Sequence, residues 1–437
     1  MRQWLHRMPK AFQSVRELIF VNAKERSFCV PRFPVSSRLP MTLYDIRDRS
    51  RHWLHVVVAM SAWSASPSLG AQQPSTPSGV TRPDSVRRVR DDYTHLPRGR
   101  RFYHARPYGS EAQFNPLTEF LNEGYDMLRV EGYDRHVFRW NYAGGAGNII
   151  SSLVHADRTY RFYGYQRALQ NEILPLTYSD NGTGGQGWET KYSLHLLGSG
   201  MVSARMVEWG EQHGVPHPVL LAAVTMAASH LMNEILENGT SRVPNEDATT
   251  DFLIFNPGGF LLFQTDVVQR LFSDHVEFTN WPRQPAYMPM SQTLENTGQE
   301  FVMRGGLFKA KRWRWLTAFG LSTLFGVSHD QGNGYAISAA IGEDDVANPV
   351  ADARTTARTA TLRPKESLFI DREGSLLASL DVGGTPHDVL ASANVYPGAF
   401  AGMPWLPGTW VEYLRGGGVR FGVVSRLGLG LGLGPRY

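Results

Sequence analysis

Residues 218–238 read PVLLAAVTMAASHLMNEILEN, a long apolar stretch that becomes polar toward its end. Pro218 suits the first turn of a helix, and Asn238 followed by glycine is typical of the residue pair that ends one. From Leu220 to Ala228 only Thr225 is polar. This half must therefore be buried in protein or lipid, and by itself it is shorter than the roughly 20 apolar residues that cross a bilayer.

The second half of this helix carries three titratable side chains. His230, Glu234 and Glu237 are spaced i, i+4, i+7 and therefore project from one face. An unpaired carboxylate costs several kcal/mol to bury, so two of them beside a histidine need a cation, a metal or a shared proton. This face is the candidate functional site.

Further polar residues flank the helix on both sides. Lys191 and His195 share a helical face upstream, and downstream Asp251 precedes the turn Asn256-Pro257-Gly258-Gly259, whose glycines allow close backbone approach. The candidate catalytic residues are His195, His230, Glu234 and Asp251; the candidate binding residues are Lys191, Glu237, Asn238 and Asn256; and the candidate metal ligands are His230, Glu234 and Glu237. No particular cofactor is indicated.

Three interpretations of this cluster stay open. The first is a buried polar network that fixes how the helices pack, without chemistry. The second is a metal or anion site, although the His-Glu-x-x-His pattern of zinc enzymes is missing. The third is an acid/base or hydrolytic site, with Glu234 as general base or metal ligand and His195 or His230 as its partner.

The order of these residues resembles a known helical module. His195, then Glu234 with Glu237, then Asp251 and the turn from Asn256 look like the module shared by VanZ-like proteins and a related uncharacterised bacterial envelope family, over residues 188–272. This chain has Ala-Thr-Thr where that pattern has Pro-Ser before the aspartate. The resemblance implies a cell-envelope location and inward-facing polar residues, and it carries no established activity.

Composition narrows the class of protein. The chain has 437 residues, of which 42% are hydrophobic and 19% charged, with a net charge of +4. That suffices for a large core but gives little reason to expect a nucleic-acid partner. Gly144 to Gly147 lacks the Lys-Ser/Thr of a phosphate loop, so nucleotide binding is not expected either.

The segment 41–71 has the pattern of a secretory signal peptide. Arginines at 47, 49 and 51 precede the apolar run Trp53–Trp63, and Leu69-Gly70-Ala71 is an acceptable cleavage site. Met41 is then the expected start and residues 1–40 a mispredicted extension; a single membrane anchor is the alternative. Export would leave a mature chain without the sole cysteine, Cys29.

The mature chain divides into three parts. Residues 72–110, rich in Pro, Ser, Thr and Arg, are predicted to be a disordered lead-in. Residues 111–290 are predicted to be a helical region with helices at 117–128, 158–174 and 218–238. Its many aromatics fit either a membrane-interface belt or ordinary packing.

Residues 291–437 change to the period of β-strands. Leu376–Val382 and Val389–Val395 alternate apolar with polar residues and predict an antiparallel hairpin. Val419 to Leu433 alternates apolar residues with Gly or Arg, which is typical of a transmembrane strand with its apolar face toward lipid. About eight such strands would close a small antiparallel barrel; a soluble barrel or sandwich is the alternative.

The sequence therefore predicts an α+β protein with a polar helix cluster and a barrel-like C-terminal region. We expect it to be exported to the outer membrane or periplasm and to be non-catalytic. It would hold a lipid or another small ligand, or have a structural role, with membrane lipid as a partner. An envelope hydrolase acting on lipid or glycan through the His/Glu/Asp site is the alternative. Protein partners are not indicated.

Overall fold

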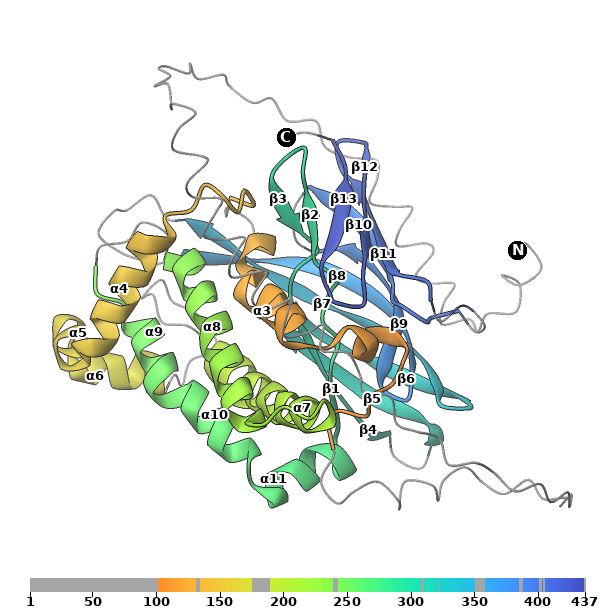
Figure 1. Cartoon of the computed structure of the whole chain (residues 1–437), viewed down its shortest axis with the longest axis horizontal. Coiled ribbons are helices and arrows are strands. Elements are labelled where there is room, and N and C mark those ends of the chain that lie inside the picture. The colour runs from red at the N-terminus through yellow and green to blue at the C-terminus, as the bar shows by residue number, and fades with distance from the viewer. Residues whose placement is uncertain are drawn as a thin grey trace, which may run out of the picture. The chain divides into compact units, whose positions relative to one another are not determined.

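The computed structural model describes residues 101–130, 134–174, 189–238, 243–307, 310–320, 322–349, 358–384, 388–400, 403 and 405–435. The predicted signal peptide at 41–71, the predicted extension at 1–40 and most of the lead-in lie outside these residues. Within the described part, helices come first and a large sheet follows, which confirms the α+β class (Figure 1).

The helical part precedes residue 277 and consists of many short segments around two longer helices. These two are α7 (Ser199–Gln212) and α8 (Pro218–Asn238). The remaining segments are η4 (Gly109–Gln113), α3 (Pro116–Gly124), η5 (Asp126–Arg129), α4 (Tyr142–Val154), α5 (Ala156–Tyr163), α6 (Tyr165–Ala168), η6 (Leu169–Ile173), η7 (Glu189–Gly198), α9 (Glu246–Thr250), η8 (Asp251–Phe255), α10 (Asn256–Phe263), α11 (Asp266–Arg270) and η9 (Leu271–His275).

The strands form one sheet. They are β1 (Glu277–Asn280), β2 (Ala286–Met288), β3 (Thr293–Glu295), β4 (Glu300–Leu307), β5 (Ala310–Gly320), β6 (Ser322–Gly332), β7 (Tyr335–Pro349), β8 (Arg358–Arg372), β9 (Ser375–Gly383), β10 (Val389–Val395), β11 (Gly408–Leu414), β12 (Val419–Val424) and β13 (Gly430–Leu433). Their order is β1, then β4 to β13, then β2 and β3. Neighbours are antiparallel except for β13 and β2, which run parallel.

The prediction of a closed barrel of about eight strands is wrong. The sheet has 13 strands, and its edge strands β1 and β3 do not pair with each other. Three of the extra strands, β1 to β3, lie between Glu277 and Glu295, a partly Pro-rich stretch that the sequence assigns mostly to the helical region. Strands of three or four residues are too short to show an alternating pattern.

The prediction of one long final strand is also wrong. Val419 to Leu433 forms two strands, because the chain reverses between β12 and β13. Gly428 has φ +82°, a conformation that favours glycine, and its amide donates to the carbonyl oxygen of Ser425 at 3.0 Å. The gapless alternation of residues 419–433 therefore belongs to two antiparallel strands joined by a turn.

Two local predictions are confirmed. The structure places α8 from Pro218 to Asn238, as the end signals indicate. Strands β9 and β10 pair antiparallel, with Ala393 opposite Leu380. Both patterns are local and strongly periodic, which is why sequence alone identifies them.

Helix α3 lies between the sheet and helices α7 and α8 (Figure 1). Asn115 caps it by accepting hydrogen bonds from the amides of Leu117 and Thr118, and Pro116 opens its first turn. All nine of its residues are buried. The side-chain amide of Asn122 donates to the carbonyl oxygen of Arg283, which joins this helix to the sheet side. An internal helix with this composition brings Glu119 and Glu123 into the core.

The two faces of the sheet differ: the inner face mixes buried charged and polar side chains with an apolar cluster that includes Leu316, Leu324 and Phe369, and the outer face exposes large apolar side chains. The face toward the helices buries polar and charged side chains: Glu300, Arg304, Ser328, Ser338, Asp344, Lys365, Ser367, Asp371, Asp381, Ser392, Asn394, Glu412 and Arg420. The other face exposes large apolar ones: Phe325, Val327, Ile337, Ile341, Leu368, Ile370, Leu380, Val382, Val411, Tyr413, Val419, Phe421, Val423, Leu431 and Leu433. This is the reverse of a half-solvated antiparallel sheet, whose polar residues point to water.

Of the described helices, only α8 is long and apolar enough to cross a membrane by length and composition, with a mean hydropathy of 1.5. Half of its most apolar stretch is buried inside the protein. The core helix of a soluble protein meets the same criterion. Val219, Leu220 and Val224 remain exposed near its start.

Candidate functional site

The predicted site residues come together where η7, α8 and the segment from α9 to α10 meet. Lys191 lies at their centre and is fully buried. Its ammonium group contacts Asp251 Oδ1 at 2.8 Å and Glu172 Oε2 at 3.4 Å, and it also binds Asp247. We call these four residues the lysine cluster. Burial opposes the charge of Lys191, but the three carboxylates raise its pKa well above the ordinary value.

The carboxylates of the lysine cluster differ in their ionisation. Burial opposes the charge of Asp247, but Lys191 lowers its pKa below the ordinary value. Burial raises the pKa of Glu172 well above its ordinary value, although Lys191 acts against this shift. The single ammonium group therefore balances the negative charge of only some of the acidic groups, and the others avoid a buried charge by holding a proton.

His195 lies beside the lysine cluster and contacts two of the predicted residues. Its Nδ1 is 3.1 Å from Asn256 Oδ1, and its Nε2 is 3.5 Å from Asp251 Oδ2. A neutral imidazole carries one N–H, so the ring donates to only one of these two oxygens. Burial lowers the pKa of His195 despite the neighbouring Asp251. The imidazole is therefore neutral near pH 7, and it links η7 to the start of α10.

His230 belongs to a second group around Glu123 of α3. The Glu123 carboxylate accepts hydrogen bonds from Ser199 Oγ at 2.9 Å and from Ser229 Oγ, and it pairs with His230 Nε2. Burial opposes its ionisation, but His230 and the two hydroxyl groups lower the pKa of Glu123. The result is an ionised, fully hydrogen-bonded carboxylate that joins α3, α7 and α8.

This second group does not have the geometry of a hydrolytic triad. Ser199 Oγ lies 3.0 Å from His230 Nε2, the same ring nitrogen that pairs with Glu123. In a Ser-His-acid relay the hydroxyl and the carboxylate bind opposite nitrogens of the imidazole. Here both compete for one nitrogen, so the arrangement holds helices together rather than activating the serine.

Glu234 joins the lysine cluster rather than His230. Single carboxylate oxygens of Glu234, Asp247 and Asp251 lie within 4.8 Å of one another, the only such grouping of potential metal ligands among the described residues. Asn238 Nδ2 donates to Glu234 Oε2 at 3.2 Å. The predicted metal ligands His230 and Glu237 are not part of this grouping, although Glu237 lies one turn away on the same helix.

Sequence reasoning missed Glu123, Glu172 and Asp247. Glu123 follows Glu119 by four residues on a short apolar helix, so their shared face was a usable signal. Asp247 follows Asn245, which caps α9 by accepting a hydrogen bond from the amide of Ala248. Nothing in the local pattern marks Glu172, because its partner Lys191 comes from another segment.

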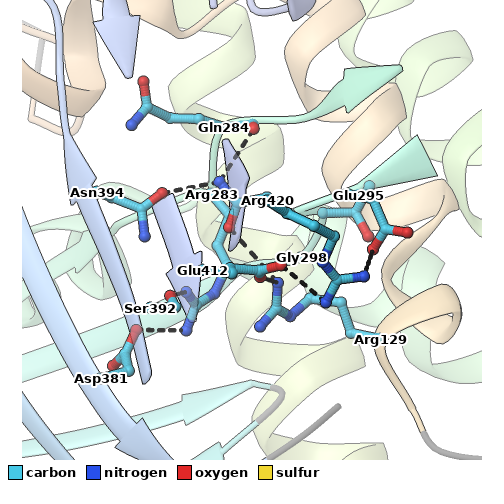
Figure 2. Close-up of polar contacts among 12 residues, drawn as sticks. Arg129, Arg283, Gln284, Glu295, Gly298, Asp381, Ser392, Asn394, Glu412 and Arg420 are labelled. Carbon is cyan, nitrogen blue, oxygen red and sulfur yellow. Dashed lines mark hydrogen bonds and ion pairs between the residues drawn. The ribbon is translucent and has the colours of Figure 1, made fainter. Parts of the chain in front are cut away.

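The sheet interior holds a separate polar network (Figure 2). Arg420 contacts Glu295 at 3.1 Å and Glu412 at 3.0 Å, and Arg129 contacts Glu412 at 3.3 Å. Arg283 contacts Asp381 at 2.9 Å. These side chains come from β3, β9, β11 and β12, from η5 (Arg129) and from the segment between β1 and β2 (Arg283). They connect strands that are distant in sequence.

A small cavity adjoins this network. Arg283, Glu300, Asp381 and Tyr396 line it together with apolar side chains, and its volume of about 10 Å³ holds roughly one water molecule.

Comparison of the chain with protein-family models, curated proteins and solved structures gives no match. The site is therefore interpreted from its own geometry.

Proposed function

We propose that this chain is a non-catalytic integral protein of the cell envelope, in the outer membrane, whose sheet presents its apolar face to lipid. The observation that carries the proposal is the inverted sheet, with charged residues buried on one face and large apolar residues exposed on the other. Transmembrane sheets alternate in this way, with apolar residues toward lipid.

The exposed apolar residues form continuous rows across neighbouring strands. Phe325 and Ile341 are directly opposite each other on β6 and β7 and are 64% and 68% exposed. Val411 of β11 is likewise opposite Phe421 of β12, at 42% and 46%. Soluble monomers seldom expose contiguous apolar patches of more than a few hundred Å². Contact with lipid hydrocarbon would remove the free-energy cost of exposing these apolar side chains to water.

Strand length and turn composition support the same environment. Strands β5 to β9 have nine residues or more, and a tilted strand needs about 9–11 to cross the hydrocarbon; β10 to β13 are shorter, with four to seven residues each. Charged or polar residues occupy the strand ends and turns, such as Asp330 and Gln331 at the end of β6, Asn333 in the turn before β7 and Arg415 after β11. An apolar band with polar ends matches a bilayer in cross-section.

The open edges of the sheet require cover, because unpaired strand edges are not tolerated in hydrocarbon. All three residues of β3 are buried, and a bridge pairs Thr293 with His136. In β1, Phe278 and Asn280 are buried. The helical region thus covers the two edge strands, β1 and β3, which in a closed barrel would pair with each other.

The role that fits this architecture is structural or ligand-holding. Lys191 and Glu123 each bind several partners, as members of packing networks do. The alternative, an envelope hydrolase, is less well supported because Ser199 and Glu123 share one nitrogen of His230.

Replacing Ile341 by arginine tests the proposal. At the middle of a lipid-facing strand an arginine costs about 2–4 kcal/mol, whereas on a water-exposed surface the effect stays within about 0.5 kcal/mol. We expect Ile341→Arg to lose most of the protein from the urea-resistant outer-membrane fraction. The control Gln331→Arg, at an exposed position near the end of β6, should assemble normally. A soluble protein whose stability is unchanged by Ile341→Arg would refute the proposal.

A further inference from the structure

The antiparallel order gives the sheet two ends with different connections. At one end lie the links from β6 to β7, β8 to β9, β10 to β11 and β12 to β13; we call this the turn end. The links from β5 to β6, β7 to β8, β9 to β10 and β11 to β12 lie at the other, which we call the loop end.

The described N-terminal segment is attached to the turn end. Arg106 Nε contacts Glu373 Oε2 at 3.3 Å in the β8–β9 turn. The amide of Gly109 donates to Pro397 O at 2.7 Å in the β10–β11 connection. Gln113 Nε2 donates to Ser425 O at 3.0 Å in the β12–β13 turn. Three successive connections at this end thus hold the segment through which residues 1–100 join the sheet.

We propose that the turn end faces the periplasm and the loop end faces the cell exterior. This inference rests on the proposed membrane location. An exported chain reaches the outer membrane from the periplasm, so the segment before Arg101 stays on that side unless it crosses the bilayer. It contains arginines at 82, 87, 88, 90, 98 and 100. Moving such a segment through hydrocarbon is costly.

The orientation also assigns a side to the lysine cluster. Helix α7 ends at the turn end, where Glu208 accepts hydrogen bonds from the amides of Arg101, Phe102 and Tyr103. At its other end, Gly198 lies against Phe301, which pairs with Phe319 next to the β5–β6 link. The cluster just before α7 therefore lies toward the loop end, on the exterior side.

Cysteine labelling tests this assignment in whole cells. The only native cysteine is removed by Cys29→Ser. Gly416→Cys reports on the loop end, since Gly416 is exposed with nothing within 4 Å of an added Cβ. Gln331→Cys reports on the turn end, and Ile341→Cys, on the apolar face, is the matched control. The probe is a membrane-impermeant maleimide, applied to intact cells and to cells with a permeabilised outer membrane.

We expect Gly416→Cys to be labelled in intact cells, Gln331→Cys only after permeabilisation, and Ile341→Cys in neither. Labelling of Gln331→Cys alone in intact cells would reverse the orientation but leave the membrane location standing. If positions 331 and 416 respond alike, the two ends lie on the same side and the orientation is wrong. Labelling of Ile341→Cys as readily as Gln331→Cys, in protein that fractionates as soluble, would instead refute the membrane proposal.

Discussion

The sheet interior and the lysine cluster bury charge in different ways. In the sheet, Arg420 meets Glu295, Glu412 and Asp388, and Arg304 meets Asp371 at 2.6 Å and also Glu277. The guanidinium groups of Arg420 and Arg304 each bind more than one carboxylate through several donors. In the helical region a single ammonium, that of Lys191, faces three carboxylates, with Glu234 nearby.

This difference indicates where the protein responds to pH. A guanidinium keeps its charge at all accessible pH values and matches carboxylates with two parallel hydrogen bonds. The arginine-centred part of the sheet network is therefore a fixed framework. The lysine cluster has more acidic groups than Lys191 can compensate, so some of them must hold protons. In the sheet, Lys365 likewise faces Glu300, Asp344 and Asp381, and burial raises the pKa of Glu300 to about 7. Stability should therefore depend on pH through these two lysine-centred groups rather than through the arginine pairs.

The largest effect is expected from Arg420→Met in the sheet interior. The change removes the cation that Glu295 and Glu412 share and leaves them with Arg135 and Arg129 alone, so we expect the lower end of the cost of breaking a buried ion pair, about 3 kcal/mol. Urea unfolding should show this loss of stability. Arg415→Met, at an exposed turn position, is the control and should be nearly neutral. An Arg420 variant as stable as the control would mean that this network does not support the fold.

The next effect is expected from Lys191→Met, and it should depend on pH. The lowered pKa of Asp247 contributes stability above the ordinary carboxyl pKa that is lost as pH falls through the lowered value. Without Lys191 that contribution disappears, at a cost of about 3 kcal/mol at pH 8. In acid, protonation of the carboxylates shrinks the cost.

Urea unfolding of the Lys191 variant at pH 4 and pH 8 measures this contrast. Arg158→Met, a change at an exposed helical cation, is the matched control. Equal losses at both pH values would erase the proposed difference between the lysine cluster and the sheet interior.

A smaller, opposite effect is expected from Glu119→Gln in α3. Burial, and then the charge of Glu123, raise the pKa of Glu119 to about 8. The folded protein therefore holds a proton that the unfolded chain releases near pH 4.5, and stability falls as pH rises between these values. Glutamine removes this dependence.

The Glu119→Gln variant should match the parent at pH 4 and exceed it at pH 8 by on the order of 2 kcal/mol. Chemical unfolding across this range measures the difference, with Glu211→Gln at an exposed position of α7 as control. A variant less stable than the parent at pH 8 would show that Glu119 is ionised in the folded protein.

The smallest effect is expected from chelation. The carboxylates of Asp247 and Asp251 already bind the ammonium of Lys191, so the cluster has a cation of its own. A strong chelator should leave the thermal unfolding midpoint unchanged. A drop of several degrees that added Ca²⁺ or Mg²⁺ restores would identify a metal bound in addition to Lys191.

Local patterns made part of this architecture predictable. Helix α8 and the β9–β10 hairpin follow from spacing over neighbouring residues. The polar face of α8 was likewise readable, because side chains three or four residues apart share a helix face. Among the predicted residues, Lys191, Asp251, His195 and Asn256 do come into contact.

Contacts between distant segments were not predictable in this way. Glu123 and His230 are 107 residues apart in the chain, and α3 gives no local sign that it enters the core beside α8. The parallel pairing of β13 with β2 joins Gly430 to Ala286, through strands of only four and three residues. Such short strands carry no period, so their pairing depends on the tertiary fold. The VanZ-like resemblance remains a prediction.

The most direct test of the central claim is to measure the environment of the exposed sheet face. The Ile341→Cys variant, in the Cys29→Ser background, is labelled with a nitroxide and placed in membranes. The label is then exposed either to oxygen, which concentrates in lipid, or to a water-soluble nickel chelate. A label at Gln331→Cys serves as the reference. The account predicts frequent oxygen collisions and few nickel collisions at position 341, with the reverse at 331. Nickel access at position 341 equal to that at 331 would contradict it.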